Sequence, residues 1–137
     1  MKQLIVFLAV ILFLMFFPLQ IALSQINHHQ LLTAQEIAHN YAQRARQHGY
    51  YRPEDISELR EELASRLNLD ASQLTIHVTT APKYRFDRFV PGELIDYEIH
   101  IPVNRLLVMN RFIGVPDEDN SMRQVIKGQV HSEVLLP

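Results

Sequence analysis

Apolar side chains fill the first part of the chain almost without interruption. Leu4–Phe17 is a run of fourteen apolar residues, and the apolar character continues past Pro18 with only Gln20 breaking it. The whole segment holds about 20 residues, the number that an α-helix needs to cross the hydrocarbon core of a bilayer. The pattern predicts a transmembrane segment or signal anchor over residues 1–24 and an extracytoplasmic α+β domain over residues 25–137.

This first segment has two possible fates. As a secretory signal it ends in the small-x-small site Ala22-Leu23-Ser24, and cleavage there would release a secreted or cell-surface binding domain beginning at Gln25. As a retained anchor it runs on toward Gly49 without any turn signal after Pro18, a continuity that a signal peptide does not need. Lys2 and the amino terminus favour the cytoplasmic side, so the remainder lies outside in either case. We expect the anchor: a single-pass protein of the cell membrane with its N-terminus in the cytoplasm.

A narrow, alanine-rich apolar stripe follows the membrane segment. Its residues recur at three- and four-residue steps, the spacing of one face of an amphipathic helix. Gly49 stands where a C-cap glycine belongs. The residues assigned to helix–sheet packing are Ala34, Ile37, Ala38, Tyr41 and Ala45. Those assigned to contact with lipid or with neighbouring helices are Leu4, Phe7, Ile11, Leu14, Phe17, Pro18 and Ile21.

A second helix and a run of strands complete the predicted fold. Pro53 begins the helix, because proline followed by acidic residues is typical of a first turn, and the apolar spacing places its end near Asn68. The apolar period then changes to two, which predicts strands over Leu74–Thr79, Leu94–Val103 and Met122–Val134. The order of elements indicates an α+β fold, with a long N-terminal helix, a short second helix and a small antiparallel sheet of about three strands.

Two connecting segments carry distinctive side chains. Lys83–Phe89 alternates aromatic and basic residues. The pattern fits a nucleic-acid surface, a loop whose aromatics pack under a sheet while the bases extend to water, or a contact surface for a protein neighbour. The net charge of −2 and the lack of a basic block favour the second interpretation, and we expect no nucleic-acid partner. Asn104–Ile113 is apolar and is expected to form a short helix or turn packed beside the sheet.

The search for reactive groups gives only weak candidates. The chain has no cysteine and four isolated glycines, and its serines lack the context of a nucleophile elbow. His77 and His100 can share the polar face of neighbouring strands, and Asp117 and Asp119 offer carboxylates in a loop, but neither pair has a diagnostic ligand spacing. We therefore predict a protein that is not an enzyme and needs no metal or cofactor.

The succession of an apolar helix, an alanine-rich amphipathic helix and a small antiparallel sheet resembles pilin-like proteins. In particular it is similar to the TadE-type minor pilins, or pseudopilins, of bacterial tight-adherence and related secretion systems. The stretch Val78–Arg85 and the ending Ser132–Pro137 also resemble an uncharacterised family of short membrane-anchored bacterial proteins. The resemblance implies a subunit of a surface pilus or secretion apparatus, whose partners are the membrane and other pilin-like subunits, including further copies of the chain.

Two departures from the pilin pattern refine this expectation. Pilins are cut after a small residue that precedes the apolar run, and they carry a glutamate at the fifth mature position. Here Gln3 precedes the run, and no acidic residue occurs before Glu36. The resemblance therefore implies an unprocessed or minor component rather than a major filament subunit.

Overall fold

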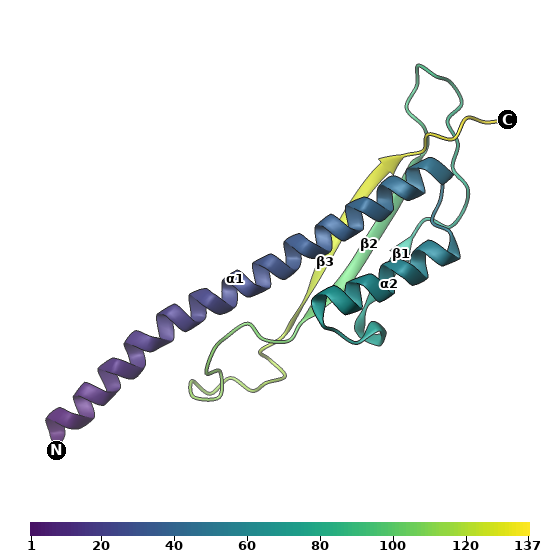
Figure 1. Cartoon of the computed structure of the whole chain (residues 1–137). Helices are drawn as coiled ribbons and strands as arrows, with labels where there is room; N and C mark the ends of the chain where they lie inside the picture. The colour runs from purple at the N-terminus through teal and green to yellow at the C-terminus, as the bar shows by residue number, and fades with distance from the viewer. The chain divides into compact units, whose positions relative to one another are not determined.

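The computed structural model describes residues 1–137 and has the α+β fold that the sequence predicts (Figure 1). Its helices are α1 (Lys2–His48), α2 (Pro53–Leu67) and the short 3₁₀ turn η1 (Ala71–Gln73). Its strands are β1 (Thr75–Val78), β2 (Leu94–Val103) and β3 (Met122–His131), which form one three-stranded sheet in the order β1-β2-β3.

The contacts divide the chain into two compact units. The helix–loop unit contains Met1–Gln30 and Val103–Met122, and the sheet unit contains Leu31–Pro102 and Arg123–Pro137. This division differs from the sequence-based boundary at residue 24, because residues 103–122 make their contacts with the first part of α1. Each unit is described separately below.

Helix α1 is helical throughout its 47 residues, including Pro18. A proline ring carries no amide hydrogen, so the ladder of main-chain hydrogen bonds loses one donor at that turn. The helix ends at His48, and the following Gly49 has φ of +84° and donates its amide hydrogen to the Ala45 carbonyl at 2.7 Å. This left-handed conformation is the one for which glycine is favoured at a helix C-terminus.

In the sheet unit, α2 and the C-terminal part of α1 cover the same face of the sheet (Figure 1). The residues assigned to helix–sheet packing, Ala34, Ile37, Ala38, Tyr41 and Ala45, are all at most 5% exposed. They form one core with Leu59, Leu63 and Leu67 of α2 and with Ile95, Ile99 and Ile101 of β2. The small alanine side chains let the helix backbone approach the core closely, and the larger residues supply most of the buried apolar area.

The sheet keeps the predicted alternation of faces. Strand β1 pairs antiparallel with β2, with Ile76 opposite Ile99 and Val78 opposite Tyr97. On β3, Gly128 lies against the Tyr97 ring, and a Cβ added at Gly128 would collide with that ring. Glycine at position 128 therefore lets the Tyr97 ring approach the backbone of β3 closely. The ring occupies the space that a side chain at position 128 would fill.

Two details of the sheet unit differ from the expectations. Strand β3 ends at His131, because the Ser132 hydroxyl donates to the Lys83 carbonyl at 2.7 Å and the chain leaves the ladder there. In the Lys83–Phe89 loop, Phe86 and Phe89 are 68% and 94% exposed, so the expectation that the aromatics pack under the sheet is wrong for both. The Arg85 guanidinium donates to carbonyl groups of this same loop, which curls around it and turns the two rings outward.

An ion pair between the buried Asp55 and the partly exposed Arg52 lies at the start of α2. Asp55 is 2% exposed, and its two carboxylate oxygens accept hydrogen bonds from Arg52 Nε at 2.9 Å and from Arg52 Nη2 at 3.1 Å. Hydrogen bonding from Arg52 lowers the pKa of Asp55 below its usual value. Bidentate pairs of this kind are among the stronger hydrogen bonds in proteins.

Asp55 should make the stability of the sheet unit depend on pH. Since its pKa is lower in the folded chain than in the unfolded one, its contribution is complete above about pH 4 and is lost as the pH falls through the folded value. We expect Asp55→Asn to destabilise the protein by about 1–3 kcal/mol at pH 7 and to reduce the loss of stability between pH 7 and pH 3. Urea unfolding of the detergent-solubilised chain measures both effects. Glu54→Gln, at the exposed neighbouring position, is the control, and an unchanged pH dependence in Asp55→Asn would contradict the assignment.

Candidate functional site

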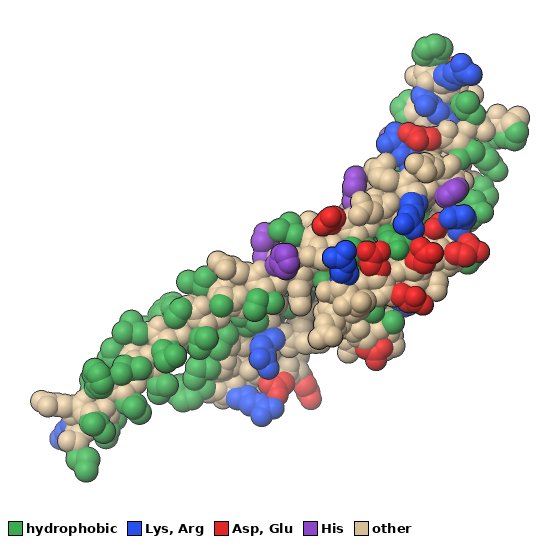
Figure 2. Space-filling view, viewed as in Figure 1, with side chains coloured by type: hydrophobic (Ala, Val, Ile, Leu, Met, Phe, Trp, Pro, Cys, Tyr) green, Lys and Arg blue, Asp and Glu red, His purple; other side chains and the backbone are tan.

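The most conspicuous surface of the protein is the N-terminal part of α1. Leu4, Phe7 and Leu14 are 68%, 66% and 63% exposed, and no residue of the most apolar 18-residue stretch is buried. Figure 2 shows this apolar surface, with charged side chains gathered over other parts of the chain. The length and composition are those of a membrane span or of a signal sequence. A helix of a soluble core would instead bury such side chains.

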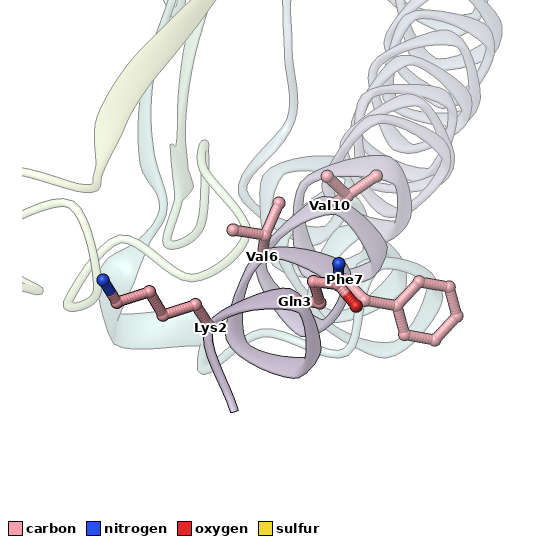
Figure 3. A pocket seen from close by; sticks show the side chains of 5 residues that line it. All are labelled: Lys2, Gln3, Val6, Phe7 and Val10. Atoms are coloured by element: carbon pink, nitrogen blue, oxygen red, sulfur yellow. The ribbon is translucent and has the colours of Figure 1, made fainter.

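The first two turns of α1 carry no reactive group. Figure 3 shows that the side chains here project outward from the helix in different directions. The residues that line a shallow hollow at this end are Lys2, Gln3, Val6, Phe7 and Val10. Lys2 is the only ionisable side chain among them, and a single basic residue beside an apolar run is typical of the cytoplasmic end of a membrane segment.

Residues 103–122, here called the return loop, are held against one face of α1 by side-chain amides. Gln20 Nε2 donates to the Leu106 carbonyl at 2.8 Å, and Gln20 Oε1 accepts the Val108 amide hydrogen at 2.9 Å. Two turns further along, Asn27 Nδ2 donates to the Arg105 carbonyl at 2.9 Å. The one polar residue inside the apolar run is thus paired through both ends of its side chain.

Below these contacts, the return loop and α1 line an apolar hollow of about 300 Å³. Its lining consists of Ala9, Leu12, Phe13 and Phe16 from α1 and of Met109, Phe112 and Ile113 from the loop. The segment Asn104–Ile113 therefore packs on α1, and the expectation of a position beside the sheet is corrected. The physical reason is the pairing of its backbone with Gln20, which the spacing of apolar residues cannot reveal.

Two buried asparagines give the return loop its shape. Asn120 Oδ1 accepts the amide hydrogens of Leu106 and Leu107 at 3.1 and 2.7 Å, and Asn120 Nδ2 donates to the Leu107 carbonyl at 3.0 Å. Asn110 Nδ2 donates to the Val115 carbonyl at 2.9 Å. Both asparagines are at most 9% exposed. A loop without regular secondary structure thereby satisfies many of its own main-chain groups.

The return loop leaves the opposite face of α1 uncovered. Successive residues of an α-helix turn by about 100°, so Ile11, two residues from both Ala9 and Phe13, lies about 160° around the helix from them. Pro18 has the same relation to Gln20. The residues assigned to lipid or subunit contact, Leu4, Phe7, Ile11, Leu14, Phe17, Pro18 and Ile21, are all exposed.

The two strand histidines proposed as weak metal candidates do lie together. The rings of His77 and His100 are 6.0 Å apart between centroids, and they extend from the paired strands β1 and β2. His100 Nε2, however, is 2.6 Å from Glu98 Oε1, and Lys127 Nζ is 3.4 Å from Glu98 Oε2. The hydrogen bond with His100 lowers the pKa of Glu98, and Lys127 adds to this effect. The arrangement is a surface hydrogen-bond network in which Glu98 contacts both His100 and Lys127.

The acidic loop is used in a similar, structural way. Asp117 accepts hydrogen bonds from Asn110 Nδ2, at 2.8 Å, and from the Arg111 guanidinium, while Asp119 is exposed. The chain contains no group of three or more His, Asp or Glu side chains placed to hold a metal ion. His77, His100, Asp117 and Asp119 are therefore not brought into one ligand set.

Sequence reasoning missed the residues that position the return loop. The sequence pattern marks Gln20 only as a break in the apolar run and Asn120 only as part of the acidic loop, and it gives no role to Asn110. The available signal was the cost of an unpaired amide inside a membrane-length apolar segment, which implies a partner for Gln20 elsewhere in the chain. Comparison of the chain with protein-family models, with curated proteins and with solved structures finds no match.

We expect Gln20→Ala to release the return loop from α1. The substitution leaves the Leu106 carbonyl and the Val108 amide without their partner, at a cost of about 1–3 kcal/mol. Hydrogen exchange of the Val108 amide in the micelle-bound protein should become about tenfold faster or more. Gln25→Ala, an exposed position of the same helix, is the control and should leave the rate unchanged. Equal rates at Val108 in wild type and Gln20→Ala would show that the amide contact does not hold the loop.

Proposed function

We propose that the protein is a non-enzymatic, membrane-anchored, pilin-like subunit of a bacterial surface filament or secretion apparatus. The observation that carries this proposal is the single helix α1, which begins as an exposed apolar segment of membrane length and continues into the alanine stripe that packs on the sheet. In the proposed topology the N-terminus is cytoplasmic and the sheet unit is extracytoplasmic.

The return loop supports a retained anchor rather than a cleaved signal. Gln20 lies before the Ala22-Leu23-Ser24 site and Asn27 lies after it, and both donate to the same loop. Cleavage before Gln25 would remove Gln20 together with the whole helical wall of the apolar hollow. The exposed loop residues would then face water, and two main-chain groups would lose their partner.

The uncovered face of α1 supports an assembly role. An apolar helix face is stable either among lipid tails or against neighbouring helices, and association exchanges one environment for the other at small net cost. The return loop closes one side of the helix to such neighbours, so that the side containing Ile11 is the one left for them. Pro18 lies on this side and weakens the main-chain ladder there, which favours a local bend.

The exposed rings of Phe86 and Phe89 favour a second candidate, a binding domain that acts after release from the membrane. Large exposed aromatic side chains are enriched where proteins contact partners. The mature N-terminus separates the two functions. We expect intact-mass measurement of the native protein to give a chain that retains residues 1–24, whereas a chain beginning at Gln25 would exclude the anchored subunit and support the secreted domain.

Cysteine cross-linking tests the assembly face directly, because the chain has no native cysteine. Copies that carry Ile11→Cys or Leu14→Cys should form disulfide-linked dimers in native membranes. Leu12→Cys, at nearly the same depth but in the hollow beside the return loop, is the matched control and should give several-fold less dimer. Equal yields at the three positions, or none at any, would contradict a defined helix–helix contact through the uncovered face.

A further inference from the structure

The middle of the return loop forms an exposed apolar tip. Met109, Phe112 and Ile113 are 37%, 76% and 53% exposed, yet they lie beside the most apolar part of α1. Building on the proposed anchor, we propose that this tip inserts into the outer leaflet of the membrane, where a lipid acyl chain fills the hollow between Phe112 and Phe16. The protein would then hold the bilayer through a helix and a second, non-helical wedge.

The depth of the tip follows from its contacts along α1. Gln20 marks the outer end of the uninterrupted apolar run, and the hollow is lined by α1 residues from Phe16 to Ala9. At about 1.5 Å per residue, these positions lie about 6–16 Å below Gln20 along the helix axis. With Gln20 at the boundary between headgroups and acyl chains, the tip reaches the outer half of the hydrocarbon core, which is roughly 30 Å thick.

Irregular backbone is tolerated in that region only when its polar groups have partners within the protein. The return loop meets much of this demand. The amide hydrogens of Leu106, Leu107, Val108, Phe112, Gly114 and Val115 are all donated to acceptors of the loop or of Gln20. A loop in contact with lipid needs such pairing more than a water-exposed loop does. At the tip the pairing is incomplete, because the amide hydrogens of Met109, Asn110, Arg111 and Ile113 have no acceptor within the chain.

The charged residues set the limit of insertion. Glu118 and Asp119 belong to the turn that leads to Asn120, and Asn120 bonds to Leu106, the residue whose carbonyl Gln20 binds. These two exposed carboxylates are thus tied to the level of Gln20. Arg111 is nearer the tip, but its guanidinium pairs with Asp117, and its long side chain lets the charge extend toward the headgroups.

A series of single-tryptophan variants tests the wedge, since the chain contains no tryptophan. The full chain is reconstituted at low density in phosphatidylcholine vesicles with and without lipids brominated on their acyl chains. Phe112→Trp should show blue-shifted emission, and the brominated lipids should quench it to an extent comparable with Phe17→Trp, the depth-matched control on α1. Phe89→Trp in the sheet unit, at a 94% exposed position, should show neither effect.

The outcomes separate the wedge from the anchor. Quenching of Phe17→Trp without quenching of Phe112→Trp would overturn the wedge and leave the anchor intact. Loss of quenching at both positions would overturn the anchor itself. Blue-shifted but unquenched emission of Phe112→Trp, lost on further dilution in the vesicles, would assign the tip to a contact between copies of the chain and would also overturn the wedge. Circular dichroism of each variant confirms that the helices are present.

Discussion

One helix has to meet two different physical demands. The main-chain ladder of α1 runs from Lys2 to His48, so the angular positions of its side chains are linked along its whole length. In the first half, apolar side chains surround the helix and none of the most apolar stretch is buried by the protein. In the second half, small apolar residues are confined to a stripe that the sheet and α2 cover. In the proposed anchor, the change from an all-round apolar surface to a narrow stripe corresponds to the transition from lipid to protein as the surrounding medium.

The apolar first half of α1 also contains one polar residue, Gln20, which binds the return loop. A primary amide within an apolar helical segment of membrane length is costly unless both its carbonyl and its amino group have partners. Here the return loop provides one partner for each, and Asn120 in turn holds the loop backbone in the required shape. The polar residues of this region therefore form one connected set. Removing Gln20 or Asn120 leaves partly buried groups unsatisfied, so the pairing defines the position of the loop as well as stabilising it.

Most of the fold could be predicted from the sequence, but the polar contacts that hold the return loop could not. The helices, the strand Leu94–Val103 and the alanine stripe follow from periods of 3.6 and 2, which depend on neighbours along the chain. The end of β3 depends on Ser132 and Lys83, which are 49 positions apart, and the path of the return loop depends on Gln20 and Leu106, which are 86 apart. Periodicity carries no record of such pairs. It also could not show that Arg85 binds the carbonyls of its own loop and so leaves Phe86 and Phe89 in solvent.

The distribution of chemistry along the molecule is consistent with a structural role. Where acidic and basic side chains come together, as at Asp55–Arg52 and at Glu98–Lys127, they form ion pairs. The apolar surfaces are different, because the uncovered face of α1 and the tip of the return loop have no partner within the chain. Contact of these two apolar surfaces with lipid or with another protein would therefore be favourable, because it removes them from water. In the proposed arrangement, the wedge contacts lipid on one side of α1 and the free face on the opposite side remains available to a neighbouring helix.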